Sequence, residues 1–516
     1  MPNQPLRSTA SALMQVPPIA ASRTSAEDGI RRIRNQLRKY SVRSVVDAAL
    51  NALWTDHGSD FENLKAAPWV SMLLAKWAVA DRMAHINIGP AIPQPAFDRL
   101  RQAVWELPHR NEGTAPPTSA MALVRPLLQQ QMEFQRPQGW GFVRWPALIA
   151  SRPPSDAISM RFRESLGMDP DTFIDLSWGL HVSILERKPN VPNNFFAPLI
   201  ARYGQSVHDI VSLFTRDLAA LRAELGKPDA LNVRGRAELR EFSYLRRFPF
   251  VRLSPNAITC WHPAVLARGM EDAVHLRLSD FGEQYTRPFS KLFESYVIEL
   301  SIDAVADAVP EALYESALGP EASMVEAIIR EPQCNVLVEA KMSLFADSVL
   351  ASDNPNTIYQ KTKRVYEAFA KGWKVTLDLA DSTNPFHRPD IAENYLLIVV
   401  SRQLHVGTGP HLAEIYPTGR LDYPDETAAT RLPLRHVFIL SIEDFERATA
   451  AVRSGVTSFQ QMLRKVVLDN AAPESAKMYF SHHLDQYDTV DPRLSKLIAA
   501  AVDASRARLE KALTDS

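Results

Sequence analysis

The sequence predicts a multidomain protein, in which a mostly α-helical N-terminal domain is followed by an α/β domain built on a mixed β-sheet. Residues 26–240 carry apolar side chains at helical spacing, as from Val207 to Leu225, and Pro-rich stretches separate the helical segments. After about Phe248, short β-like runs alternate with helical segments, and Trp373 to Leu379 is expected to be one of the strands. Strands interleaved with helices are typical of a mixed sheet that helices cover on both faces.

Length and composition fit this organisation and narrow the function classes. The chain has 516 residues, enough for two or three domains, and its 23% of charged residues is ordinary for a globular protein. The net charge is −1, so a nucleic-acid surface would have to come from local patches. Only Cys260 and Cys334 are present, which excludes a disulfide framework and fits a reducing cytoplasm. The apolar runs are too short to cross a bilayer, so we expect a cytoplasmic protein without a membrane partner.

The predicted domain boundaries follow changes in the sequence pattern. Residues 1–25, rich in Ser, Ala and Pro, are expected to be a disordered lead-in, and residues 26–240 a helical recognition or regulatory domain. Residues 241–470 form the predicted α/β domain, and residues 471–516 a helical C-terminal extension. Aromatic clusters in the N-terminal domain, such as the one around Trp140, suit binding of a protein partner, but they also suit simple packing.

The tripeptide Glu339-Ala340-Lys341 is the most informative local feature. It ends the apolar run Val336-Leu337-Val338, and the pattern predicts a strand over 335–341. Side chains alternate between the two faces of a strand, so Glu339 and Lys341 are expected on the same face. A carboxylate and an ammonium fixed side by side at a strand end are suited to holding a divalent metal ion and activating a water molecule.

The preceding segment predicts a hairpin partner for this strand. Residues 324–330 also have a strand pattern, and Glu331-Pro332-Gln333-Cys334 is typical of a turn. Pairing the two strands places Glu326 opposite Glu339. Two opposed carboxylates repel each other, and a hard cation such as Mg²⁺ between them would reverse the sign of that interaction. The alternative is that these are two exposed strand ends whose charges have no joint role.

Polar residues on two flanking helices complete the pattern. Residues 289–297 are amphipathic, and Glu294 lies beside the apolar stripe rather than within it. Asn354-Pro355 is a helix start, and the helix that follows carries Gln360 off its apolar stripe.

This order of helix, strand, strand and helix resembles the PD-(D/E)XK, or restriction-endonuclease-like, nuclease superfamily, over roughly Arg246 to Leu468. The resemblance implies a restriction-endonuclease-like core with a mixed β-sheet flanked by helices. It also implies an Mg²⁺-dependent nuclease in which Mn²⁺ can replace Mg²⁺. The expected substrate is nucleic acid, with DNA favoured over RNA. Carried over position by position, the implied catalytic residues are Glu294, Glu326, Glu339, Lys341 and Gln360. The family usually has Asp, often after Pro, where this chain has Val325-Glu326.

The resemblance also assigns roles. Glu326 and Glu339 would ligate the metal together with the backbone carbonyl of Ala340, and Lys341 would orient or deprotonate the attacking water. Gln360 would position water or phosphate, and Glu294 would be an outer or second-metal ligand. The residues expected to contact nucleic-acid phosphates are Lys361, Lys363, Arg364, Arg246 and Arg247.

Two alternatives to a nuclease remain open at the level of the sequence. The core could be a catalytically inactive nuclease fold that binds nucleic acid or serves as a scaffold. It could instead hydrolyse another phosphodiester, such as a nucleotide second messenger. A helical domain fused to such a nuclease is similar to bacterial antiviral or mobile-element defence proteins, which is a likeness of fold alone.

Overall fold

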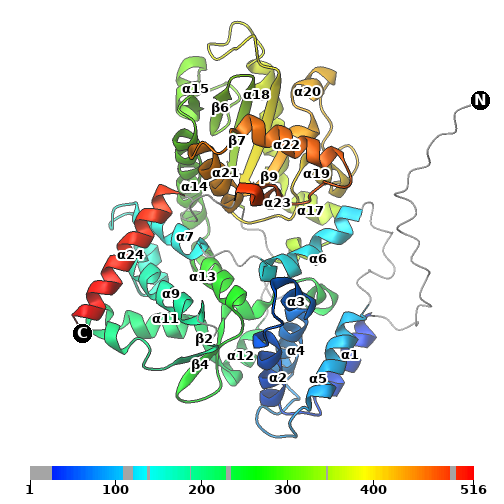
Figure 1. Cartoon of the computed structure of the whole chain (residues 1–516), viewed down its shortest axis with the longest axis vertical. Helices are drawn as coiled ribbons and strands as arrows, with labels where there is room; N and C mark the ends of the chain where they lie inside the picture. The colour runs from blue at the N-terminus through cyan, green and yellow to red at the C-terminus, as the bar shows by residue number, and fades with distance from the viewer. Residues whose placement is uncertain are drawn as a thin grey trace, which may run out of the picture.

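The computed structural model describes residues 26–107, 120–135, 140–185, 188–227, 234–343, 347–487 and 495–515 (Figure 1). The predicted lead-in at residues 1–25 lies outside these ranges. The described part is mainly helical up to residue 227, as expected. Its α-helices are α1 (Ala26–Leu37), α2 (Val42–Trp54), α3 (Asp60–Lys65), α4 (Pro68–Ala80), α5 (Gln94–Trp105), α6 (Ala120–Gln135), α7 (Gly141–Ala150), α8 (Ala157–Leu166), α9 (Pro170–Leu185), α10 (Ile200–Tyr203), α11 (Ser206–Phe214) and α12 (Leu218–Gly226).

A small sheet joins this helical part to the chain after residue 240. Its strands, in the order β1-β4-β3-β2, are β1 (Asn190–Pro192), β4 (Ala257–Cys260), β3 (Phe250–Arg252) and β2 (Thr215–Asp217). The two strands that come after residue 240 confirm the β-like runs predicted there. Because β1 and β2 come from the helical part, backbone pairing crosses the predicted boundary.

The second sheet is mixed and has the order β5-β6-β7-β8-β9. Its strands are β5 (Ala308–Pro310), β6 (Ala327–Glu331), β7 (Cys334–Lys341), β8 (Glu393–Val400) and β9 (Val437–Ser441). The first three strands are antiparallel neighbours, whereas β7, β8 and β9 are parallel. This confirms the prediction of a mixed sheet in an α/β arrangement.

The hairpin of β6 and β7 has the predicted register. Ile328 pairs with Leu337, and Arg330 pairs with Asn335 across a two-residue turn of Pro332 and Gln333. Ala327 pairs with Val338, so the residues one step further along are Glu326 and Glu339.

Helices cover both faces of this sheet. Val336, Val338 and Ala340 of β7 face a core that includes α14 (Glu283–Ala304) and α21 (Ile442–Arg453). Leu337 faces the opposite core with α18 (Lys363–Asp378). The other α-helices of this half are α13 (Pro263–Leu278), α15 (Glu311–Leu318), α16 (Asp347–Leu350), α17 (Pro355–Lys361), α19 (Gly409–Ile415), α20 (Glu426–Arg431), α22 (Phe459–Ala471), α23 (Phe480–Leu484) and α24 (Lys496–Thr514). Short 3-10 helices are η2 (Ala197–Leu199), η3 (Gly235–Leu239), η4 (Tyr244–Arg247), η5 (Ser279–Phe281), η6 (Leu434–His436) and η7 (Asp485–Tyr487).

One strand expected from the sequence is wrong. The pattern from Trp373 to Leu379 suggested a strand after the Gln360 helix, but almost all of it belongs to α18. The helical spacing of Val365, Phe369, Gly372 and Thr376, all buried in α18, continues through the segment. Trp373 and Val375 have high β propensity, and the tertiary packing of this stripe overrides it.

The C-terminal helix α24 packs on the middle of the chain. It lies along α7 and α9, and Arg508 donates two hydrogen bonds to Asp175 of α9, at 2.7 and 2.8 Å (Figure 1). One hydrophobic core runs from Phe142 in α7 to the sheet at Val338 and on to Ala512 in α24. Among the helices that the structure describes, none has the length and apolar character that a membrane crossing requires.

Candidate functional site

The hairpin brings two buried carboxylates together at the end of β7. Glu339 is fully buried and Glu326 is 4% exposed. Glu326 is held by the backbone, because the N–H of Ala340 donates to its Oε2 at 2.9 Å. The antiparallel register therefore does what the sequence pattern predicted: it places two acidic side chains beside each other in a region of low dielectric, where their repulsion is strong.

Two lysines approach these carboxylates. Lys341 Nζ forms an ion pair with Glu339 Oε1 and lies 3.7 Å from Glu326 Oε1. It also donates to the carbonyl of Ala340 at 3.0 Å. Lys371, from α18, donates to Glu339 Oε1 at 3.0 Å and lies 2.9 Å from Oε2. The predicted pairing of Glu339 with Lys341 on one face is present, and Lys371 adds a second cation from the covering helix.

The environment perturbs the protonation of the cluster. Burial raises the pKa of Glu339 to about 8, and the neighbouring carboxyl of Glu326 contributes through its charge and a shared hydrogen bond. Lys341 and Lys371 lower the same pKa but do not cancel the rise. For Lys341, burial lowers the pKa, and the nearby carboxylates of Glu326, Glu339 and Glu294 outweigh it, so the net pKa is raised. A carboxyl that titrates near neutral pH and an ammonium held beside it are typical of functional sites.

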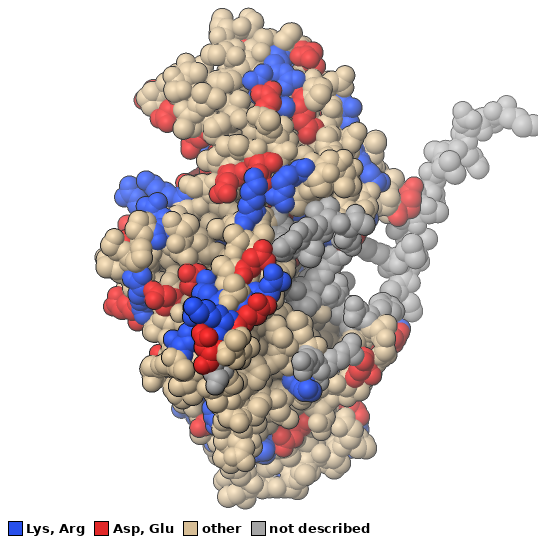
Figure 2. Space-filling view, turned by 60° about the vertical axis from the view of Figure 1, so that its left-hand side comes forward, with Lys and Arg blue, Asp and Glu red and all other residues tan. Residues whose placement is uncertain are grey.

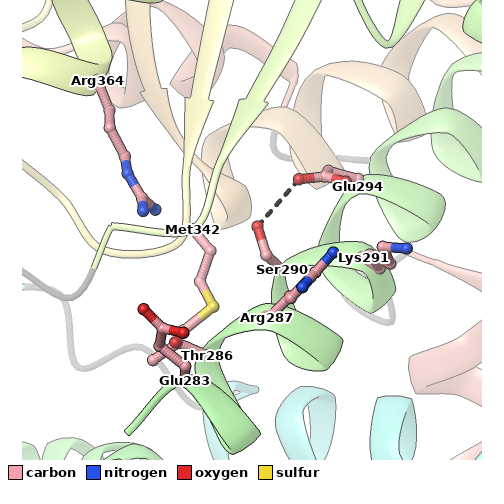
Figure 3. A pocket seen from close by; sticks show the side chains of 8 residues that line it. All are labelled: Glu283, Thr286, Arg287, Ser290, Lys291, Glu294, Met342 and Arg364. Carbon is pink, nitrogen blue, oxygen red and sulfur yellow. Dashed lines mark hydrogen bonds between the residues drawn. The ribbon is translucent and has the colours of Figure 1, made fainter.

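A pocket of about 520 Å³ lies at the end of β7, between α14 and the start of α18. Figure 3 shows its lining side chains, with Met342 between the α14 residues and Arg364. Glu294 belongs to this lining, accepts a hydrogen bond from Ser290 at 2.9 Å, and acts electrostatically on Lys341. The structure therefore brings Glu294 to the border between the pocket and the carboxylate cluster, as predicted.

Gln360 is not among the residues gathered here. It is exposed on α17, and no contact with the carboxylates is found for it. The helix is interrupted at Thr362, between α17 and α18. The helix that covers the cluster, α18, therefore starts after Gln360. Lys371 of α18 takes the position on the covering helix that the sequence had given to Gln360. The unbroken helical spacing through Gly372 was the signal for it.

Glu311 is a second residue that the sequence analysis missed. It opens α15, and its N–H donates to the carbonyl of Glu326 at 2.9 Å. Burial raises its pKa; Lys371 lowers it, and Glu326 and Glu294 raise it further. This carboxyl therefore borders the same cluster. The position of Glu311 depends on the pairing of β5 with β6, which no local sequence pattern predicted.

The predicted phosphate contacts divide into accessible and buried residues. Lys361, Lys363 and Arg364 are exposed, Lys363 pairs with Glu367 at 3.3 Å, and Arg364 lines the pocket.

Arg246 does not fit its predicted role. It is 2% exposed and bonds to Asp272 at 2.7 Å and Asp347 at 2.6 Å, so its guanidinium serves internal ion pairs rather than a surface. Arg247 is half-buried and lies over the ring of Tyr244, 4.8 Å from its centroid. Both arginines lie in the short helix η4, which packs into the core beside the acidic partners of Arg246.

The donor set can be compared with what a hard cation requires. Within the described ranges, no group of three or more His, Cys, Asp and Glu side chains gathers at metal-binding spacing. A cation here would rest on Glu326, Glu339 and the carbonyl of Ala340. All three offer oxygen atoms, and in this structure the carboxylate of Glu339 is held by ion pairs with Lys341 and Lys371. Mg²⁺ takes one or two carboxylates and keeps several waters, so this oxygen set fits it.

Comparison with known proteins adds no relative: no family model matches the chain, and neither the curated proteins nor the solved structures contain a match. The geometry of the cluster is therefore the basis for assigning a function.

Proposed function

We propose that this protein is a metal-dependent nuclease that hydrolyses phosphodiester bonds in nucleic acid, with DNA as the first substrate to test. The observation that carries the proposal is the pair of buried carboxylates, Glu326 and Glu339, which two lysines and a pocket border at the end of β7. The order of α14, β6, β7 and α18 around them supports a restriction-endonuclease-like core.

In this proposal Glu326, Glu339 and the carbonyl of Ala340 would hold Mg²⁺ or Mn²⁺. When bound, the metal would lower the pKa of a coordinated water and offset negative charge on the phosphate oxygens. The N–H of Ala340 fixes the orientation of the Glu326 carboxylate at 2.9 Å, so that ligand is positioned before any metal arrives. Such preorganisation reduces the reorganisation needed during the reaction.

The lysines would act on the water and the phosphate. Lys341 Nζ, which rests against Glu339 and the Ala340 carbonyl, would turn toward the attacking water and orient it. Lys371, 31% exposed, would place its ammonium near a nonbridging phosphate oxygen and stabilise the charge that develops there. Glu294 would hold a water or a second cation from the pocket side.

The test compares the purified protein with Glu339→Ala and Lys341→Ala in a plasmid cleavage assay. We expect cleavage by the wild type with Mg²⁺ or Mn²⁺, none with EDTA, and severe loss in both variants. Equal cleavage by the wild type and both variants would contradict the assignment, because a contaminating nuclease would then be responsible.

A second candidate function is nucleic-acid binding without turnover. One observation favours it: both lysines already neutralise Glu339, so the cluster is electrostatically satisfied without a metal. The Glu at position 326, where the resembling family usually has Asp, points the same way. Nucleic-acid binding that is unaffected by EDTA, together with no cleavage under any metal condition, would select this alternative.

A further inference from the structure

The pocket beside the cluster has charged walls. Arg287 and Lys291 reach it from α14, and Arg364 reaches it from α18; all three are exposed. Figure 3 shows Arg364 extending from its helix toward the pocket, across Met342 from the α14 residues. The acidic members of the lining are Glu283 and Glu294. Three cations against two carboxylates make the pocket a local positive site in a chain whose net charge is −1.

Helical spacing connects these cations to the carboxylate cluster. On α14, Arg287, Lys291 and Glu294 stand at i, i+4 and i+7, so they share one face of the helix. On α18, Arg364 and Lys371 are also seven residues apart. Seven residues of α-helix span about 10 Å. On α14, Glu294 therefore lies about two turns beyond Arg287 and acts on Lys341. On α18, Lys371 lies about two turns beyond Arg364 and contacts Glu339.

The depth of the carboxylates limits what can reach them. Glu339 is fully buried, so a scissile phosphate cannot reach it from the outer surface, and the pocket approaches it through Glu294, which lines the pocket and acts electrostatically on Lys341. A volume of about 520 Å³ lies in the range of about 300–1,000 Å³ typical of small-ligand pockets. A duplex presents phosphates along a wide, rigid surface, and proteins meet it with broad basic faces. On the face turned forward in Figure 2, lysine and arginine side chains are interspersed with acidic ones and form no such area.

We infer that the pocket binds the backbone of a single nucleic-acid strand. Arg287, Lys291 and Arg364 contact its phosphates as the strand passes between α14 and α18. An unpaired strand bends freely and can lower one phosphate into a narrow pocket, which a paired backbone cannot do. The inference rests on the proposed function for the place of the scissile phosphate at Glu326 and Glu339.

The experiment measures binding without turnover. Fluorescence anisotropy of a labelled oligonucleotide of about 12 nucleotides in EDTA compares a single strand with a blunt duplex of the same sequence. We expect the single strand to bind at least about ten-fold more tightly. The double variant Arg287→Ala/Lys291→Ala should weaken single-strand binding about ten-fold, and each lost phosphate contact should reduce the salt slope by about 0.7. Arg364→Gln should weaken it less.

The matched control is Arg99→Ala, which removes an exposed cation on α5, far from the sheet in Figure 1. Thermal melting of every variant checks the fold. Unchanged single-strand binding in the pocket variants, or a preference for the duplex, overturns the inference even if Mg²⁺-dependent cleavage is observed. Selective loss of single-strand binding in a protein that cleaves nothing would instead support the pocket and contradict the nuclease proposal.

Discussion

Two buried clusters in the described part of the chain share one arrangement, in which a lysine lies between two glutamates. In the helical half, Lys76 of α4 lies between Glu238 and Glu241, with its Nζ 3.1 Å from Glu238 Oε2. In the sheet half, Lys341 lies between Glu326 and Glu339. Burial raises the pKa of Glu241 to about 8, the same value as for Glu339.

The difference between the two clusters is access. Lys76 is 3% exposed, and Glu238 accepts hydrogen bonds from Trp77 Nε1 at 2.9 Å and from the backbone N–H of Gly235 at 3.0 Å. In the sheet half the lysine that bridges the carboxylates is 19% exposed, and a pocket lies beside it. A perturbed pKa accompanies both clusters, so the pKa alone does not mark a reactive site. The opening does.

The largest expected effect concerns the closed cluster. Lys76→Met leaves two buried glutamates without their shared cation, which should cost about 3–5 kcal/mol of stability. Lys341→Met should cost much less, because Lys371 still pairs with Glu339 and water reaches the site. Urea denaturation of both variants measures the difference. Comparable destabilisation by the two substitutions would mean that the clusters are equally structural.

The next prediction exchanges one carboxylate in each cluster for its amide. Glu339→Gln replaces one of the two carboxylates that would hold Mg²⁺ in the proposed nuclease, and it should lower Mg²⁺-dependent cleavage by about a hundred-fold or more. Glu241→Gln makes the same chemical change in the closed cluster and should leave the cleavage rate unchanged. Initial rates of plasmid cleavage by the two variants and the wild type measure the difference. A parallel loss in both variants would trace the effect to folding rather than to the site.

A smaller effect should distinguish α18, which carries Lys371, from α17, which carries Gln360. Lys371→Ala removes the ammonium that contacts Glu339, and we expect cleavage to fall about ten-fold, a cost of about 1.4 kcal/mol. Gln360→Ala, on exposed α17, should change the rate by less than about two-fold, as for most surface substitutions. If Gln360→Ala proves the more damaging change, α17 must move toward the carboxylates when substrate binds.

The last prediction is the pH dependence of the closed cluster. The pKa of Glu241 is raised on folding, so the folded state holds its proton at pH values where the unfolded state has lost it. Its contribution to stability is complete below the unfolded pKa of 4.5 and is lost as pH rises through about 8. The loss is at most about 1.4 kcal/mol per pH unit. Glu241→Gln should reduce the change of the melting temperature between pH 5 and pH 8, which a series of thermal melts measures. An unchanged pH dependence would mean that another group is responsible for it.

The sequence predicted the hairpin and the pairing of Glu326 with Glu339 because both follow from local alternation and a short turn. It did not predict Lys371 or Glu311, which reach the cluster through α18 and through the pairing of β5 with β6. It also placed Arg246 on the surface. A basic run in the sequence shows positive charge, but it does not show that Asp272 and Asp347, which are distant in the sequence, pair with Arg246 in the folded chain. Local periodicity was informative, whereas long-range partners were not visible.

The packing of α24 has a consequence for how the protein is made. Arg508 and its partner Asp175 are 333 residues apart, so α9 emerges from the ribosome long before the helix that covers it. At about 5–20 residues per second, the delay is about 17 to 67 s. During that time the side of α7 and α9 that α24 later covers is exposed in the nascent chain. The helical half therefore completes its core only after the sheet has been synthesised, and a chaperone that binds apolar surfaces would meet the protein in that interval.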